Sequence, residues 1–262
     1  MPELPEVAFA AGVARAVAVG RTITSIQVLH HAQRRVLPAR RARLLVGDRV
    51  DAVERRGKTQ LFRLTSGRVL TVHFRMTGDW VVRAAGEALP PRARAVLAFD
   101  DGVRLVLDDS RALSVIALVE PGASLVPGLG PDADDPDFTP ASLGAVLATR
   151  RIPIKLALLD QRVVAGLGNI YAAEALWSAK IDPRRPANRL RSLRLKRLVA
   201  AIRSVLAKAT RHAERYYSRG LAAPNRFAVY DREGEPCRRC GSRIKRIVQG
   251  ARSTYFCAKC QS

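Results

Sequence analysis

The chain has 262 residues, of which 48% are hydrophobic and 26% charged, a balance typical of a folded globular protein and not of a disordered one. Lys and Arg outnumber Asp and Glu by 45 to 23, which gives a formal net charge of +22. No apolar stretch approaches the roughly 20 residues that span a bilayer, and the first residues are acidic rather than basic. We therefore expect neither a membrane protein nor a secreted one, but a cytoplasmic protein.

The excess positive charge lies mostly in the C-terminal half. Residues 151–262 carry 25 basic and 7 acidic side chains, whereas residues 1–150 carry 20 and 16. A GC-rich genome would enrich Arg throughout, and 38 of the 45 basic residues are Arg, but it would not by itself concentrate the excess in one half. The asymmetry predicts a surface that binds a polyanion, of which nucleic acid is the main candidate.

The N-terminal residues predict a short helix followed by a segment of strands. Pro5 suits a first helical turn, and residues 6–11 favour a helix. From residue 21 to residue 120 the sequence consists of short runs that contain β-branched residues and are separated by turns. This pattern predicts a β-sandwich or barrel. Residues 121–137 are rich in Pro, Gly and Asp, and we expect them to link two domains.

The second half is predicted to be helical. Thr139 followed by Pro140 is a capping pattern for a helix that runs to about residue 150. Further helices are expected from Ile154, across residues 170–179 after a break at 166–169, and from Ser192, which we expect to cap a long helix. The expected fold is α+β, with a β-sandwich and its N-terminal helix in residues 1–130, a helical domain in 131–220 and a cysteine-rich module in 221–262.

All four cysteines lie in the last 26 residues, as two pairs with Cys-x2-Cys spacing. They are Cys237, Cys240, Cys257 and Cys260. Two such pairs can close tetrahedrally on one Zn²⁺, and four thiolates leave no open position for catalysis, so the expected ion is structural. Two disulfides are the alternative, but the N-terminus does not resemble the signal peptide that an oxidising compartment would require. The residues between the pairs look like a basic β-hairpin that would contact phosphate.

The N-terminus, which reads MPELPEV, offers a catalytic amine. Removal of Met1 would expose the secondary amine of Pro2, which titrates near pH ~8 and is partly uncharged at neutral pH. Glu3 and Glu6 are three residues apart, hence on one helical face beside this amine, where they would serve proton transfer. Taken alone, the simpler interpretation is stronger, because many proteins begin Met-Pro and a glutamate in a first turn usually complements the helix dipole.

Several motifs, taken together and in their order along the chain, favour the catalytic interpretation of the N-terminus. They are MPELPEV, RGK at 56–58, HFRMTG at 73–78, GLGNIY at 166–171 and the terminal four-cysteine hairpin. Together they resemble the formamidopyrimidine-DNA glycosylase and endonuclease VIII family of base-excision repair enzymes, from residue 2 to about residue 261. The resemblance implies a helix–two-turn–helix motif in the helical domain, one structural Zn²⁺ and no nucleotide cofactor.

The activity implied by the resemblance is that of a bifunctional DNA glycosylase and AP lyase, both a hydrolase and a lyase. Such an enzyme flips a damaged base out of the duplex. It excises the base through a Schiff base at Pro2 and then nicks the strand by β,δ-elimination. The implied partner is damaged double-stranded DNA, bound by a monomer associated with the nucleoid.

Site residues follow from the same resemblance, position by position. Pro2 matches the Schiff-base nucleophile, and Glu3 matches the acid/base that helps open the sugar ring. Glu6 matches the second carboxylate, and Lys58 matches the β-hairpin lysine that contacts phosphate and assists catalysis. Met76 matches the wedge that fills the space left by the flipped base. The DNA contacts implied in this way are His73, Met76, Arg111, Leu113, Lys155, Asn169 and Arg252.

Simpler interpretations stay open at some positions, and others depart from the family pattern. Lys58 could be a surface lysine, and Met76 a core methionine at a strand end. In the second void-filling loop, residues 109–114, Leu113 replaces an aromatic side chain and Ala112 a second Arg, which weakens stacking. Residues 218–227 lack the Asp-Gly-x-Pro-Gly pattern of the loop that closes over an oxidised purine, so we expect 8-oxoguanine not to be the best substrate.

Two other functions stay open from the sequence. One is a catalytically silent nucleic-acid-binding paralogue on the same scaffold, which borohydride trapping on abasic DNA would distinguish, because only a reactive amine crosslinks. The other is a ribosomal or transcriptional zinc-ribbon protein, which a preference for RNA over damaged duplex DNA would favour.

Overall fold

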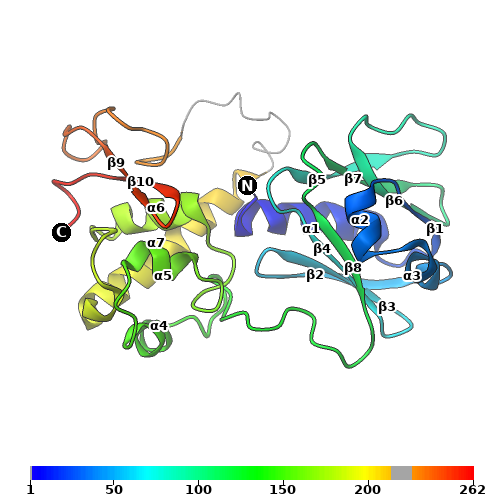
Figure 1. Ribbon diagram of the computed structural model, residues 1–262, viewed down its shortest axis with the longest axis horizontal. Coiled ribbons are helices and arrows are strands. Elements are labelled where there is room, and N and C mark those ends of the chain that lie inside the picture. Colours follow the sequence, from blue (N-terminus) through cyan, green and yellow to red (C-terminus); the bar gives the residue numbers. More distant parts are fainter. Residues whose placement is uncertain (1, 214–225) are drawn as a thin grey trace. The chain divides into compact units, whose positions relative to one another are not determined.

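The computed structural model describes residues 2–213 and 226–262. The chain divides into two compact units, Met1–Pro127 and Gly128–Ser262 (Figure 1). The division falls within the stretch 121–137 whose Pro, Gly and Asp content predicted a linker. Within residues 2–213 and 226–262, every helix is either too short or too polar to span a bilayer.

The first unit is a β-sandwich of two four-stranded sheets whose strands all pair antiparallel. One sheet has the order β1-β6-β7-β5 and the other β2-β3-β4-β8. The strands are β1 (Ile23–Val28), β2 (Val50–Arg56), β3 (Thr59–Leu64), β4 (Val69–His73), β5 (Gly78–Arg83), β6 (Ala93–Phe99), β7 (Arg104–Asp109) and β8 (Val115–Val119). Their inward side chains are almost all aliphatic or aromatic and fully buried, as packing of two sheet faces requires.

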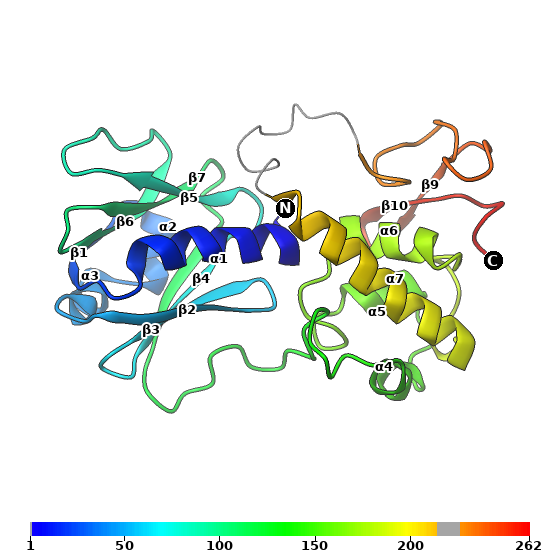
Figure 2. The same cartoon turned by 180° about the vertical axis from the view of Figure 1, so that it is seen from behind.

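Three helices accompany the sandwich. Helix α1 (Leu4–Ala18) runs along both sheets and contacts β2 and β5 (Figure 2). It is longer than predicted, and much of its buried face is alanine, which permits close approach to the strands. Helices α2 (His31–Val36) and α3 (Ala39–Ala42), with the 3₁₀ turn Arg43–Leu45, were not predicted, because they are too short to show a helical period.

The second unit contains four α-helices among its described residues. They are α4 (Pro140–Leu147), α5 (Ile154–Leu159), α6 (Asn169–Ser178) and α7 (Ser192–Thr210), with a 3₁₀ turn at Ala187–Arg189. The predicted cap at Thr139 is confirmed, because its Oγ1 accepts a hydrogen bond from the Ser142 amide at 3.1 Å. The predicted cap at Ser192 is wrong, because Arg191 occupies the N-cap position and Ser192 is the first helical residue.

The C-terminal module is a β-hairpin of β9 (Lys245–Gln249) and β10 (Arg252–Phe256). Gln249 pairs with Arg252, so that a two-residue turn connects the strands. Gly250 and Ala251 both have positive φ, 53° and 58°, which is the backbone of the turn that matches the strand twist. The α+β fold class predicted from the sequence is thus confirmed, with strands in the N-terminal unit and helices and the hairpin in the C-terminal one.

Candidate active site and metal centre

The first turn of α1 holds two buried carboxylates directly after Pro2. Pro2 is half-buried, whereas Glu3 and Glu6 are only 1% and 6% exposed. Glu3 is the N-cap residue, and its backbone amide donates to Glu6 Oε2 at 3.0 Å. The start of the helix therefore fixes both carboxylates. In the sequence, Glu3 is the first residue after Pro2 and Glu6 is the fourth.

Lys58 and His73 come together across two neighbouring strands. Lys58 lies in the tight turn between β2 and β3, where Gly57 adopts a φ of 57°, and its side chain is 9% exposed. The next residue, Thr59, pairs with His73 at the end of β4. Lys58 is not the exposed surface lysine of the simpler interpretation, since a lysine is seldom buried to this extent without a specific environment.

His73 is held as a neutral imidazole. Burial lowers its pKa to about 4, and the positive charges of Arg75 and Lys58 act in the same direction. Its Nδ1 accepts a hydrogen bond from the Arg75 amide at 3.0 Å, so in the neutral ring the proton lies on Nε2. At neutral pH His73 therefore presents an N–H donor without a positive charge.

The Met76 side chain stands at the tip of the turn that joins β4 to β5. It is 39% exposed, so Met76 is not a core methionine at a strand end. Arg75 has a φ of 58°, and Gly78 closes the turn so tightly that a Cβ there would lie 2.9 Å from Phe74 Cα and the Phe74 carbonyl oxygen. The turn thus projects Met76 outward from a compact backbone.

A second exposed loop follows β7 and lies beside this turn. Arg111 is exposed, and Leu113 is 44% exposed. The buried Asp109 accepts a hydrogen bond from Thr77 Oγ1, which joins this loop to the turn that carries Met76. Gly78 also pairs with Asp109 across β5 and β7.

In the second unit, Lys155 and Asn169 meet at the hairpin. Lys155 is fully buried, and its Nζ donates to the Ser253 carbonyl and to Thr254 Oγ1, both at 2.8 Å. Asn169, at the start of α6, donates from Nδ2 to the same Ser253 carbonyl at 3.0 Å. These contacts lock α5 and α6 onto β10 and fix the position of the exposed Arg252, the neighbour of Ser253.

The four cysteines converge as the spacing predicted. Their Sγ atoms all lie within 4.8 Å of one another. The Sγ atoms of Cys237 and Cys260 are 4.0 Å apart, and those of Cys240 and Cys257 are 3.5 Å apart. Zn–S bonds of about 2.3 Å in a tetrahedron require S···S edges of about 3.8 Å. The donor set thus fits one structural Zn²⁺, and the cysteines are not joined as disulfides.

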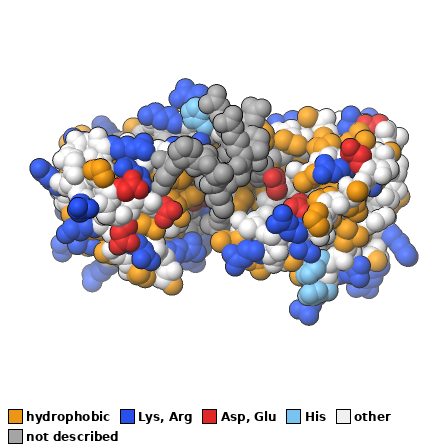
Figure 3. All heavy atoms as spheres, turned by 90° about the horizontal axis from the view of Figure 1, so that it is seen from above, with side chains coloured by type: hydrophobic (Ala, Val, Ile, Leu, Met, Phe, Trp, Pro, Cys, Tyr) orange, Lys and Arg blue, Asp and Glu red, His pale blue; other side chains and the backbone are white. Residues whose placement is uncertain are grey.

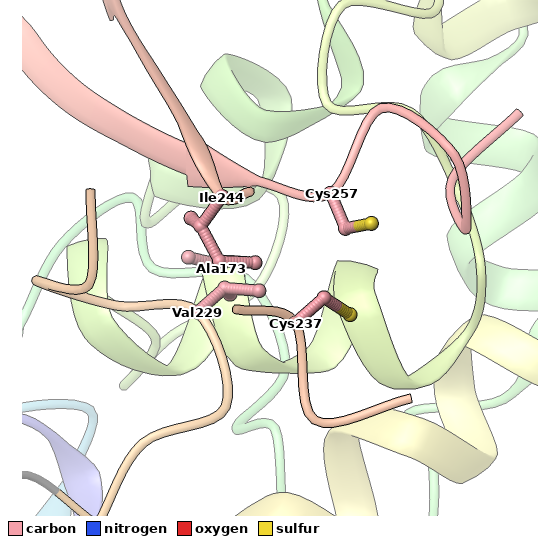
Figure 4. Packing of buried hydrophobic residues seen from close by; sticks show 5 residues of the cluster. All are labelled: Ala173, Val229, Cys237, Ile244 and Cys257. Atoms are coloured by element: carbon pink, nitrogen blue, oxygen red, sulfur yellow. The ribbon is translucent and has the colours of Figure 1, made fainter. Parts of the chain in front are cut away.

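A small apolar cluster supports this metal centre (Figure 4). It contains Ala173, Val229, Cys237, Ile244 and Cys257, with Trp177 packed against it. The Arg239 guanidinium lies 4.2 Å from the centroid of the Trp177 ring. So few apolar residues cannot stabilise the module alone, and the metal supplies the remaining folding free energy.

Positive side chains are numerous on the face of the molecule that Figure 3 presents. Figure 3 shows many Lys and Arg side chains on the face that it presents and few Asp and Glu. This is the surface expected of a protein with a net charge of +22 that binds a polyanion.

The structure groups the predicted site residues into four sets. Three lie in the first unit: the N-terminal turn, the pair Lys58 and His73, and the two loops of Met76 and Arg111 with Leu113. The fourth set, in the second unit, joins Lys155 and Asn169 to the hairpin.

Sequence reasoning missed the buried supports of these sets. Asp109 and Thr77 belong to motifs that the sequence analysis identified, but nothing in the sequence indicated a separate role for either residue. Gln33, whose Nε2 donates to the carbonyls of Ala112 and Ser114, gave no signal, because its helix was not predicted. The stretch 218–227, which lacks the sequence pattern of the purine-covering loop, lies mostly outside the described residues, since 214–225 are not part of them.

Family models match three segments of the chain. The formamidopyrimidine-DNA glycosylase N-terminal domain matches residues 1–116. The formamidopyrimidine-DNA glycosylase H2TH domain matches residues 129–218, and the zinc finger found in FPG and IleRS matches residues 234–262.

Individual proteins are similar over their whole lengths. The formamidopyrimidine-DNA glycosylase of Chloroflexus aggregans is 41% identical, over 100% of this chain and 98% of the relative. That of Bacillus subtilis is 36% identical, over 100% and 99%. The crystal structure of the Lactococcus lactis enzyme non-covalently bound to DNA containing an AP site has a TM-score of 0.88 at 30% identity, covering 99% of both chains. The Thermus thermophilus structure has a TM-score of 0.84 at 34% identity, covering 99% and 98%.

Proposed function

Because the chain belongs to the formamidopyrimidine-DNA glycosylase family, and is a DNA glycosylase that acts on damaged DNA, we propose that it is bifunctional, with an AP lyase activity that uses the amine of Pro2. The observation that carries this proposal is the first turn of α1. Two carboxylates are buried there beside the residue whose nitrogen becomes the N-terminus when Met1 is removed. A buried carboxylate next to a secondary amine is suited to proton transfer at that amine.

The proposed reaction begins when the uncharged Pro2 nitrogen attacks C1′ of the deoxyribose. The N–C1′ bond forms as the glycosidic bond breaks, the base leaves with a proton from water, and the amine passes its own proton to the Glu3 carboxylate. Glu3 protonates the sugar-ring oxygen, so that the ring opens and the adduct becomes an iminium ion. The iminium acidifies the C2′ proton, and its removal expels the 3′-phosphate, after which a second elimination expels the 5′-phosphate. Water then hydrolyses the adduct and restores the amine.

We propose that the remaining site residues hold the DNA. Lys58 supplies a phosphate contact beside the reacting sugar, and His73 donates from Nε2 to a backbone oxygen. Met76, with Arg111 and Leu113, fills the space that the extruded nucleotide leaves, because unstacking costs a few kcal/mol that such contacts offset.

In the second unit, Asn169 and Arg252 contact the DNA backbone, and these contacts carry no sequence information. Lys155 holds the hairpin through its hydrogen bonds to Ser253 and Thr254, and we assign to it a place near the DNA backbone and lesion. The Zn²⁺ holds the hairpin closed and takes no part in the chemistry. The protein would act as a monomer on chromosomal DNA.

The lesion preference is proposed from the amino-acid sequence of residues 218–227. Since its sequence departs from the purine-covering pattern, we propose that formamidopyrimidines or oxidised pyrimidines are excised faster than 8-oxoguanine. Single-lesion duplexes compared under single-turnover conditions test this, and comparable or faster excision of 8-oxoguanine would contradict it.

Borohydride trapping tests the lyase proposal. The processed protein is incubated with an abasic duplex and sodium borohydride, which reduces the iminium to a stable amine. We expect a protein–DNA adduct whose mass and fragmentation place the sugar on Pro2. A Pro2→Gly variant should reduce trapping, and an N-terminal extension should abolish it. Glu3→Gln should slow base excision, whereas Glu54→Gln, an exposed partner of Arg63, should not.

Two results would contradict the proposal. One is the absence of any adduct with the processed protein, which would exclude the amine nucleophile and the lyase activity, and would leave the catalytically silent paralogue if base excision were absent as well. The other is an adduct that persists when the N-terminal amine is blocked, which would assign the nucleophile to a lysine.

A further inference from the structure

Asp109 connects the two loops that carry the proposed void-filling side chains. It is the last residue of β7 and is fully buried. One carboxylate oxygen, Oδ1, accepts from Thr77 Oγ1 in the Met76 turn and from the Arg111 amide, the latter at 3.1 Å. The other oxygen, Oδ2, accepts from the Ser114 amide at 2.7 Å. A single carboxylate thus holds the backbone on both sides of Leu113 and the turn beside it.

The carboxylate is ionised in this setting. Burial would raise the pKa of Asp109, but the hydrogen bonds from Thr77 and Ser114 outweigh burial and hold the pKa below its ordinary value. Hydrogen bonds to a charged acceptor are about twice as strong as neutral ones, so these contacts order the loop well.

The loop is also held from its other side by α2. Gln33 is 1% exposed, and its Nε2 donates to the carbonyl of Ala112 at 3.1 Å and to that of Ser114 at 2.7 Å. Ala112 has a φ of 51°, a left-handed conformation that an alanine adopts only when its surroundings impose it. Asp109 accepts the loop's amides and Gln33 donates to its carbonyls, so the backbone is fixed while the side chains of Arg111 and Leu113 stay exposed.

We propose that Asp109 is a positioning residue that makes Met76, Arg111 and Leu113 one preformed unit for filling the duplex. This inference rests on the proposed function, because it presumes that these three side chains enter the DNA. These side chains stabilise the bound DNA most effectively when their loops are already ordered before binding. Side chains on a loose loop would lose conformational entropy during base extrusion, and that cost would be added to the cost of unstacking.

The link through Thr77 offers the sharpest test. Thr77→Val keeps the shape of the side chain but removes the hydroxyl that joins the turn to Asp109, and Thr77→Ser restores it. Asp109→Asn is the second variant. Both carboxylate oxygens of Asp109 accept hydrogen bonds, so in either orientation of the amide its NH₂ group would face a hydrogen-bond donor and at least one contact would be lost. The matched control is Asp48→Asn. Asp48 is also buried in the first unit and accepts from Thr65 Oγ1 and from Ser66, but at a different turn.

Two substrates separate positioning from general stability. The first is an abasic duplex, in which an orphaned base must be accommodated, and the second is the same abasic oligonucleotide as a single strand, which has no orphaned base. We expect Thr77→Val and Asp109→Asn to slow strand cleavage on the duplex roughly tenfold and to change it less than about twofold on the single strand. Thr77→Ser and Asp48→Asn should resemble the wild type on both.

A binding measurement reports on the loops directly. A duplex with a tetrahydrofuran abasic analogue opposite 2-aminopurine cannot react, and its fluorescence reports the stacking of the orphaned base. The 2-aminopurine fluorescence should change when the wild type binds. Thr77→Val should reduce this fluorescence change by a larger factor than it reduces the affinity for the duplex.

Equal losses on duplex and single strand would overturn the positioning role, as would wild-type behaviour of both Thr77→Val and Asp109→Asn. An inactive wild type in both assays would instead contradict the proposed function, so the two failures are distinguishable.

Discussion

Acidification should destabilise the first unit through His73. Its pKa in the folded protein is about 4, because burial and the charges of Arg75 and Lys58 disfavour the imidazolium, whereas the unfolded chain titrates at its ordinary value of 6.5. Between these two values the unfolded state binds a proton that the folded state does not. The stability contribution of the neutral ring is therefore complete above pH 6.5 and is lost as the pH falls toward 4.

The size of the effect follows from the same two values. Each unit of pKa difference corresponds to about 1.4 kcal/mol, so the full loss below pH 4 is about 3 kcal/mol. Integrated from pH 7 to pH 5, the loss is about 2 kcal/mol in the free energy of unfolding.

Urea unfolding at pH 7 and pH 5 measures this loss. Trp80 lies in β5 of the first unit, with its ring 5.7 Å from that of Phe74, and reports unfolding of this unit in a Trp177→Phe background. We expect His73→Gln to reduce the stability difference between the two pH values by about 2 kcal/mol. His212→Gln, a substitution in the second unit, should leave the difference that Trp80 reports for the first unit unchanged. Equal pH dependence in the wild type and His73→Gln would refute the reasoning.

Two further predictions concern the metal and the Met76 turn. Chelation of the zinc, or Cys257→Ser, should unfold the hairpin module and shift the fluorescence of Trp177 to the red in a Trp80→Phe background; an unchanged spectrum would show that the metal is not needed for the fold. Gly78→Ala should cost about 1–3 kcal/mol, because the added Cβ meets backbone atoms of Phe74 at 2.9 Å, and thermal unfolding would measure it. Gly12→Ala, where nothing lies within 4 Å, should instead leave the melting temperature unchanged or raise it.

Local patterns in the sequence determined the order of the elements and the metal centre. The spacing of the four cysteines alone predicted one tetrahedral site, because two Cys-x2-Cys pairs restrict the geometry that four thiolates can reach. The Thr139-Pro140 cap and the β-branched runs of the first half also predicted elements correctly, since capping and period are local properties of the chain.

Tertiary structure alone decided the surroundings of the site residues. That Lys155 is fully buried against β10, that Lys58 is 9% exposed and that His73 has a pKa of about 4 all depend on strands and helices distant in sequence. The role of Gln33 was invisible for the same reason, because it acts on a loop about 80 residues away through a helix too short to predict. Residue types and spacing encode which groups are present, whereas burial and electrostatic environment arise only when separate segments pack together.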